Sequence, residues 1–106
     1  MNEAAAVYGC TSTHFANPHG LTDPNHYTTA RDMALIARNA MANETFREYA
    51  SLTSYAMPAT NLQRARTISL RDNAFRTPGT EDSPNKYYYP YGTGIKTGFT
   101  NAAGYC

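Results

Sequence analysis

The scarcity of large apolar residues constrains this chain more than any other feature of its sequence. Leu, Ile, Val and Phe together supply 13 of its 106 residues, below the ~20% level under which a chain struggles to build a core. Intrinsic disorder would also require a high net charge, and the formal charge is only +1. Nine Tyr, four Met and many Ala residues carry the remaining apolar surface. We therefore expect either a thin core filled by aromatic rings or a segment of a larger domain.

The charge balance and the hydropathy exclude several classes of protein. Nine Lys and Arg against eight Asp and Glu leave no basic excess, which argues against a nucleic-acid partner. No apolar run approaches the ~20 residues of a membrane-spanning helix, and no charged-then-apolar leader opens the sequence. Two cysteines, Cys10 and Cys106, are too few for a disulfide scaffold, so free thiols are the simpler expectation and one bridge is the alternative.

Local patterns predict short helices and strands separated by polar turns. Helices are expected over 2–8, 30–41 and 44–49, the second with a capping box at Thr29 and Asp32 and with apolar residues at helical spacing. Strands are expected over 53–57, 67–70 and 94–100, and another opens at 105. Turn residues mark 17–20, a helical turn is expected over 71–75, and 76–91 reads as a long loop.

The Lys-Thr-Gly triplet at 96–98 is the segment that points most directly to a binding or catalytic role. On a strand, the Lys96 ammonium and the Thr97 hydroxyl hold a carboxylate by charge-assisted hydrogen bonds, and Gly98 leaves room for a substrate backbone. Strict strand alternation places Lys96 and Gly98 on one face and Thr97 on the other, unless the strand lies at an edge. For the triplet alone, an exposed lysine on a strand is the simpler interpretation.

Three further blocks give the triplet a context. Segments 13–21 (THFANPHGL), 29–37 (TARDMALIA) and 101–106 (NAAGYC) stand in this order around Gly-Ile-Lys-Thr-Gly at 94–98. Together they resemble D-alanyl-D-alanine carboxypeptidases of the low-molecular-weight penicillin-binding type, over nearly the whole chain and most weakly at 71–91. Lys-Thr-Gly is also one of the motifs that penicillin-binding proteins share with class A β-lactamases.

The resemblance implies a serine-type hydrolase with the DD-peptidase/β-lactamase-like fold, an α/β domain whose helices pack on an antiparallel sheet. Residues 1–106 would form part of that catalytic domain. Such enzymes remove the terminal D-alanine of peptidoglycan pentapeptides through an acyl-enzyme on a serine. The expected setting is the cell envelope, outside the cytoplasm. The expected partners are the pentapeptide stem, β-lactam inhibitors and the remainder of the catalytic domain, with no cofactor.

The same resemblance gives each residue of the triplet a role. Lys96 supports the electrostatics and hydrogen bonding of the site, Thr97 holds the substrate carboxylate, and Gly98 permits close approach. The Phe99 N–H is one oxyanion-hole donor, paired with the N–H of the nucleophile. In the family, the nucleophilic Ser-x-x-Lys and a Ser-x-Asn motif lie upstream of the Thr-His-Phe block. This chain starts after them, so we expect it to be inactive alone.

The residues also leave other interpretations of single motifs and of the function open. Ser83-Pro84-Asn85-Lys86 matches Ser-x-x-Lys and Ser-x-Asn at once, but it lies in a loop rather than at the head of a helix. His14, His19 and His26 lack metal-ligand spacing, so no metal site is expected. The tyrosines of 87–91 could form a stacking platform for bases or sugars. We expect instead that they belong to a loop that packs its rings on the domain. The alternative functions are a β-lactamase or other serine hydrolase of the same fold, and a non-catalytic peptidoglycan- or peptide-binding module.

Overall fold

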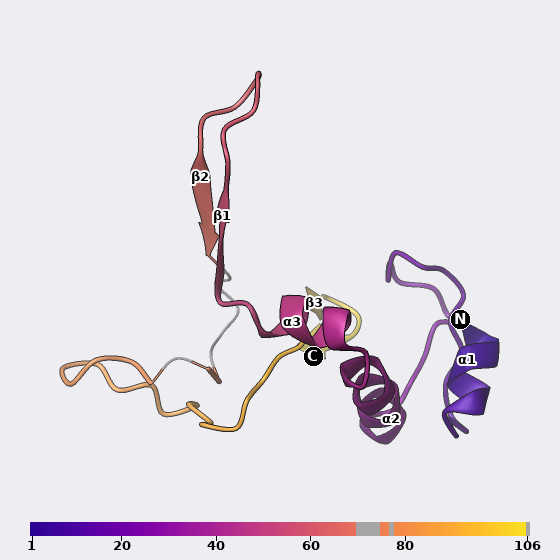
Figure 1. Ribbon diagram of the computed structural model, residues 1–106. Helices are drawn as coiled ribbons and strands as arrows, with labels where there is room; N and C mark the ends of the chain where they lie inside the picture. Colours follow the sequence, from indigo (N-terminus) through magenta and orange to yellow (C-terminus); the bar gives the residue numbers. More distant parts are fainter. Residues whose placement is uncertain (70–74, 77, 106) are drawn as a thin grey trace. The chain divides into compact units, whose positions relative to one another are not determined.

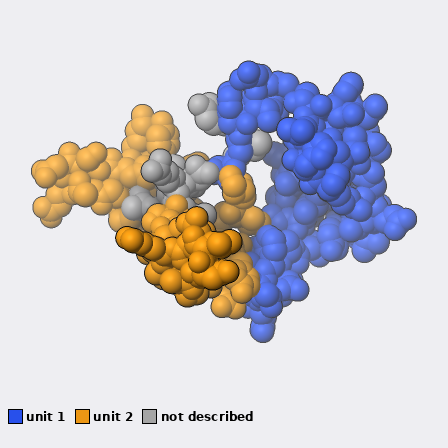
Figure 2. All heavy atoms as spheres, turned by 90° about the horizontal axis from the view of Figure 1, so that it is seen from above, with its two compact units in different colours: residues 1–47, 97–106 blue, residues 48–96 orange. Residues whose placement is uncertain are grey.

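The computed structural model describes residues 1–69, 75–76 and 78–105. The chain divides into two compact units, residues 1–47 with 97–106 and residues 48–96 (Figure 2). In the described ranges, three helices are followed by four short strands, in the order α1, α2, α3, β1, β2, β3, β4 (Figure 1). The strands form two antiparallel pairs, so the predicted α/β class with antiparallel strands is confirmed.

The first unit begins with α1 (Asn2–Val7), where the alanine-rich sequence predicts a helix. Gly9 adopts φ +83° just past the helix end, a conformation that glycine takes without steric cost and that commonly terminates helices. The Asn2 side chain reaches Phe15: its Oδ1 accepts the Phe15 N–H (2.7 Å) and its Nδ2 donates to the Phe15 carbonyl (3.1 Å). These bonds tie the start of the helix to the segment that follows it.

The predicted turn at 17–20 is confirmed. The Asn17 side chain closes it by accepting the Gly20 N–H (2.8 Å) and donating to the Leu21 carbonyl (3.0 Å), and Gly20 has φ +73°. On either side of the turn, His14 and Tyr27 form an antiparallel bridge through backbone hydrogen bonds of 2.8 and 3.0 Å. The turn therefore brings two sequence-distant segments together ahead of the next helix.

The helix α2 (Ala30–Met41) has the bounds that the sequence predicts. Thr29 is its N-cap, and the Thr29 Oγ1 accepts the Asp32 N–H (3.1 Å), which satisfies one of the four N–H groups left unpaired at a helix start. Asp32 is 2% exposed, because its carboxylate faces the segment before the helix. There it accepts the Ser12 N–H (2.8 Å) and the Thr13 hydroxyl (2.7 Å).

The helix α3 (Glu44–Ser51) follows after a short turn. As predicted, Asn43 caps it: the Asn43 Oδ1 accepts the Phe46 N–H (3.0 Å). The helix runs two residues beyond the predicted end at 49. The boundary between the two units falls inside it, after Arg47.

The second unit contains an antiparallel pair made of β1 (Ser54–Met57) and β2 (Arg66–Ser69), which Figure 1 shows as a hairpin. The register pairs Ser54 with Ser69 and Met57 with Arg66. The strand β1 lies inside its predicted range 53–57, and β2 begins one residue before its predicted range 67–70, whose last residue lies outside the described residues. In the turn between them, the Thr60 N–H donates to the Gln63 carbonyl (2.8 Å).

The strand expected over 94–100 is confirmed only at its end, where β3 (Phe99–Thr100) pairs with β4 (Gly104–Tyr105). A strand persists where a neighbour takes up its backbone hydrogen bonds, and in the described ranges no strand pairs with 94–98. The described residues of 76–91 form a loop, as predicted, with one bridge between Gly79 and Pro84. The helical turn expected over 71–75 lies almost entirely outside the described residues, and Cys106 lies outside them too.

The core is thin, as the composition predicts. Among the residues that the structure describes, Ala5 is the one buried apolar side chain and Asp32 the one buried polar side chain. The tyrosine rings of 87–91, which we expected to pack on the domain, are instead 41–77% exposed. Within the described part of the chain, no helix combines the length and apolar character needed to cross a bilayer.

Candidate functional site

The Lys-Thr-Gly segment lies in irregular backbone immediately before β3. Lys96 and Gly98 are exposed and Thr97 is half-buried. The boundary between the two units falls between Lys96 and Thr97. The structure therefore places Lys96 in the second unit, and Thr97, Gly98 and Phe99 in the first.

In the first unit, a short hairpin fixes the backbone at the end of the triplet. The register pairs Phe99 with Tyr105 and Thr100 with Gly104. The Thr100 Oγ1 accepts the Ala103 N–H (3.0 Å), and Gly104 has φ +77°, which closes the tight connection. Phe99, whose N–H is the predicted oxyanion donor, is thus the first residue of a paired strand, and its ring is 56% exposed.

In the second unit, the backbone that leads to Lys96 lies against the C-terminal end of α3. The Ser51 hydroxyl donates to the Thr93 carbonyl (3.4 Å). A Cβ built on Gly94 would lie 2.9 Å from the Ala50 carbonyl oxygen, so the two backbones approach closely. The structure thus connects the backbone two residues before Lys96 to a helix end that the sequence did not associate with it.

A buried carboxylate near the start of α2 has a shifted pKa and several hydrogen-bond partners. The Thr13 hydroxyl and then the Ser12 N–H hold the pKa of Asp32 below its ordinary 3.8, against an opposing effect of burial. Cys10 donates its thiol to the Asp32 carbonyl (3.5 Å). Burial, and next the negative charge of Asp32, raise the pKa of the Cys10 thiol above 9.0. Cys10 is a free thiol, so this centre favours a protonated sulfur beside an ionised acid.

The Ser83–Lys86 match is part of a tight turn and not of a helix. Thr80 and Ser83 exchange two backbone hydrogen bonds of 3.1 and 3.2 Å, and the Asn85 N–H donates to the Pro78 carbonyl (2.9 Å). The Lys86 Nζ lies 4.9 Å from the centroid of the Tyr87 ring, a cation–π geometry. This segment therefore does not place Ser83 and Lys86 one turn apart on a helix.

The three histidines make hydrogen bonds to backbone groups between residues 16 and 25. The His14 Nδ1 lies 2.6 Å from the Asn25 carbonyl oxygen, the His19 Nδ1 accepts the Leu21 N–H, and the His26 Nδ1 accepts the Ala16 N–H, both at 3.2 Å. In the described ranges, no three His, Cys, Asp or Glu side chains gather where they would hold a metal ion.

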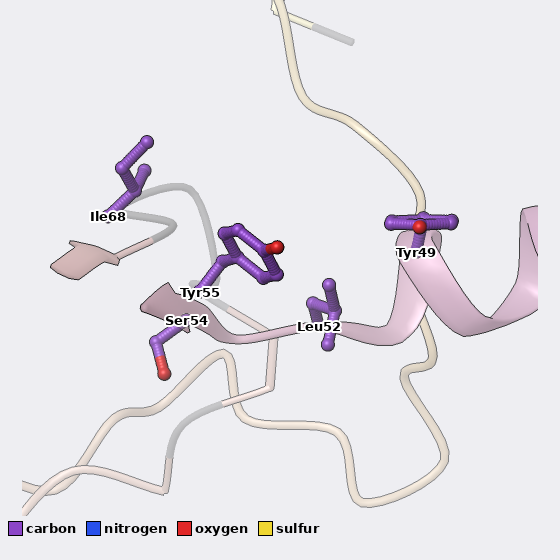
Figure 3. A pocket seen from close by; sticks show the side chains of 5 residues that line it. All are labelled: Tyr49, Leu52, Ser54, Tyr55 and Ile68. Atoms are coloured by element: carbon purple, nitrogen blue, oxygen red, sulfur yellow. The ribbon is translucent and has the colours of Figure 1, made fainter. Parts of the chain in front are cut away.

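A shallow apolar cavity of about 230 Å³ lies in the second unit (Figure 3). Its lining residues come from the end of α3 and from the β1–β2 pair: Tyr49, Leu52, Ser54, Tyr55 and Ile68. None of the residues that the sequence singled out for chemistry lines it, so the cavity and the Lys-Thr-Gly segment are separate features.

Known proteins resemble this chain over its whole length. The sequence profile of a peptidase family described as D-alanyl-D-alanine carboxypeptidase matches residues 1–106. D-alanyl-D-alanine carboxypeptidase DacF of Bacillus subtilis is 34% identical over 106 residues, which is 100% of this chain and 24% of the relative. D-alanyl-D-alanine carboxypeptidase DacB2 of Mycobacterium tuberculosis is 36% identical, over 97% of this chain and 32% of the relative.

A solved structure agrees with the sequence relatives. The crystal structure of a D-alanyl-D-alanine carboxypeptidase from Mycobacterium tuberculosis superposes with a TM-score of 0.69 at 36% identity, covering 98% of this chain and 35% of that one. The chain thus spans about a quarter to a third of the length of the relatives it matches. These matches confirm the resemblance seen in the sequence: the chain belongs to the D-alanyl-D-alanine carboxypeptidase family.

Proposed function

We propose that this chain carries the substrate-binding segment of a serine-type D-Ala-D-Ala carboxypeptidase that acts on peptidoglycan in the cell envelope. The family match over residues 1–106 is the observation that carries this proposal, because that range includes Gly-Ile-Lys-Thr-Gly at 94–98. The ligand is the D-Ala-D-Ala end of the pentapeptide stem, and β-lactams are its inhibitors. The remainder of a catalytic domain supplies the other groups of the site.

In this proposal each residue of the segment acts on the substrate. The Lys96 ammonium and the Thr97 hydroxyl hold the terminal carboxylate by charge-assisted hydrogen bonds. Gly98 brings no side chain to the backbone that the substrate approaches. The Phe99 N–H stabilises the oxyanion that develops when a serine attacks the scissile carbonyl. The exposure of Lys96 and Gly98 supports these roles, because both are accessible to a ligand.

The proposed reaction needs a nucleophile that residues 1–106 do not provide. The acyl-enzyme forms when a serine oxygen bonds to the carbonyl carbon and D-alanine leaves with a proton, and water then releases the acyl group. Ser83 is part of a tight turn closed by its own backbone bonds to Thr80, not at the start of a helix. We therefore propose that the 106-residue chain binds the ligand without being acylated.

Ligand binding tests the assignment of Lys96. Diacetyl-L-Lys-D-Ala-D-Ala is titrated into the chain and followed by amide chemical shifts, for wild type and for Lys96→Ala. Lys86→Ala is the matched control, because the chain has two lysines and both are exposed. A charge-assisted hydrogen bond contributes ~1.5 kcal/mol when a ligand shields it and less in water. Lys96→Ala should therefore weaken binding by about fivefold or more, and Lys86→Ala should leave binding unchanged. Equal loss in both variants, or none, contradicts the assignment.

Acylation tests the second half of the proposal. The chain is incubated with a fluorescent penicillin and examined by denaturing electrophoresis and mass spectrometry, with and without Ser83→Ala. We expect no covalent label in either protein. A label on the wild-type chain that disappears in Ser83→Ala would assign the nucleophile to the turn and overturn the proposal. Release of hydrolysed penicillin would favour the β-lactamase alternative.

A further inference from the structure

An arginine that the proposed chemistry does not use binds the C-terminal end of α3 and packs beside the segment before Lys96. The Arg76 guanidinium donates to the carbonyls of Ala50 (3.2 Å), Leu52 (3.4 Å) and Ser51, three successive acceptors at the helix C-terminus. The last carbonyls of a helix lack intrahelical partners and carry partial negative charge. A planar cation with five donors suits this position, because it can bond several carbonyls at once.

Arg76 also contacts the chain that leads to Lys96. A Cβ built on Gly92 would lie 3.6 Å from the Arg76 Cγ and 3.2 Å from the Tyr89 carbonyl oxygen, so Gly92 packs closely beside the aliphatic stem. The Phe75 carbonyl, one residue before Arg76, accepts the Tyr89 N–H at 2.7 Å. The arginine therefore stands between the helix end and the loop that precedes Lys96.

Thr93 and Gly94, which follow Gly92, contact the C-terminal end of α3 directly. The Ser51 hydroxyl donates to the Thr93 carbonyl (3.4 Å). Gly94 has φ +145° and approaches the Ala50 carbonyl so closely that a Cβ would lie 2.9 Å from its oxygen. A side chain at Gly94 would meet backbone rather than a flexible neighbour. Figure 1 shows this part of the chain running up to α3.

We infer that Arg76, Ser51 and Gly94 form a positioning clamp that fixes the backbone two residues before Lys96, and so sets where the Lys96 ammonium meets the substrate carboxylate. The inference rests on the proposed role of Lys96. Arg76 and Ser51 touch no substrate: they act through the backbone at 92–94. All of these contacts lie within the second unit, residues 48–96.

The test compares local backbone protection with ligand affinity. Amide hydrogen exchange at 92–96 and at the β1–β2 pair is measured for wild type, Arg76→Met, Ser51→Ala and Arg76→Lys. Arg64→Met, an exposed arginine in the turn between β1 and β2, is the control. Affinity for diacetyl-L-Lys-D-Ala-D-Ala is measured on the same proteins.

Arg76→Met should speed exchange at 92–96 by about fivefold or more and weaken ligand binding by about threefold, because it removes charge-assisted bonds. Exchange in the β1–β2 pair should not change. Arg76→Lys should recover part of both effects, because an ammonium keeps the charge but not the planar fork. Ser51→Ala should act in the same direction and more weakly.

Four outcomes would overturn the clamp. These are unchanged exchange at 92–96, faster exchange everywhere including β1–β2, faster local exchange with unchanged ligand affinity, and an equal effect of Arg64→Met. If the wild-type chain binds no ligand, the proposed function fails for this chain. The exchange data then still decide whether Arg76 and Ser51 hold the segment before Lys96.

Discussion

Removal of the Thr29 side-chain cap should loosen α2 at its first turn and leave the rest of the chain unchanged. In the structure, the Thr29 Oγ1 accepts the Asp32 N–H at 3.1 Å. Thr29→Ala leaves that N–H without its acceptor, and loss of such a cap typically costs ~1 kcal/mol. Thr29→Ser keeps an oxygen at the same position and should cost almost nothing, whereas Thr29→Gly should cost a few tenths of a kcal/mol.

A local measurement suits this chain, because with one buried apolar residue in its described part we expect a broad melt rather than a single cooperative one. Amide hydrogen exchange reports the opening of individual hydrogen bonds. A local loss of ~1 kcal/mol corresponds to about fivefold faster exchange of the Asp32 amide. Thr29→Ala should show this increase, and Thr29→Ser should match wild type.

A second cap supplies the control. The Asn43 Oδ1 accepts the Phe46 N–H at 3.0 Å at the start of α3, so Asn43→Ala should speed exchange of Phe46 and leave Asp32 unchanged. Thr29→Ala should do the reverse. Equal exchange of the Asp32 amide in Thr29→Ala and Thr29→Ser would show that the hydroxyl bond contributes nothing. An effect of Asn43→Ala on α2 would refute the assumption that the two caps act separately.

Three further predictions follow from single contacts. The folded-state pKa of Asp32 lies below 3.8, so the stability that its charge contributes is complete above the unfolded value and is lost as the pH falls through the folded value. The protection of the Ser12 amide, its intrinsic exchange rate divided by its observed rate, should therefore fall below about pH 4, and Asp32→Asn should abolish this pH dependence; an unchanged dependence would show that another group causes it. In a Cys106→Ser background, Cys10 should react with iodoacetamide at pH 8.5 more slowly than free cysteine, because burial and Asp32 raise the pKa of its thiol; Asp32→Asn should speed the reaction, and alkylation at the rate of free cysteine would contradict this. Gly79→Ala should disrupt the turn that Gly79 forms at φ +84°, since a Cβ there would lie 2.4 Å from a backbone oxygen; the shift should be confined to 78–89 in amide spectra, and wild-type spectra would refute it.

The parts of the fold that depend on local sequence could be predicted, and α2 is the clearest case. The start of α2 depends on the cap residue Thr29 and its partner Asp32, three residues later. The length of α2 follows from apolar residues at helical spacing. Both signals lie inside the helix or next to it, so the predicted bounds 30–41 match the structure. The turn closed by Asn17 was predictable for the same reason.

The role of Asp32 shows what local reasoning misses. The sequence pairs this residue with Thr29 in a capping box, and the structure shows one half of that box: the Asp32 N–H donates to the Thr29 Oγ1. Its carboxylate, however, bonds Ser12 and Thr13, about twenty residues earlier. No periodicity or spacing encodes a contact across a turn of that length. A buried acid in a thin core therefore became evident only from the structure.

The candidate site divides in the same way. The motif blocks around Gly-Ile-Lys-Thr-Gly were sufficient to predict the family, which the comparisons confirm. Strand propensity predicted a strand over 94–98 that the structure does not form, because strand structure depends on a partner far away in the sequence. The connection between the end of α3 and Gly94 is likewise a contact over more than forty residues. The roles of Lys96, Thr97, Gly98 and Phe99 stay predictions.

The Asp32 carboxylate also sets the direction of a short chain of hydroxyl groups. A hydroxyl has one proton to donate, and Thr13 gives its proton to Asp32. Thr28, whose Oγ1 lies 2.8 Å from the Thr13 Oγ1, must then be the donor in that pair, so protons point from Thr28 to Thr13 to Asp32. The two threonines are consequently not equivalent. Loss of the Thr28 hydroxyl removes one donor at the outer end of the chain. Loss of the Thr13 hydroxyl takes a partner from the buried charge and leaves the Thr28 hydroxyl with the Thr29 carbonyl, which it already reaches at 3.5 Å, as its acceptor.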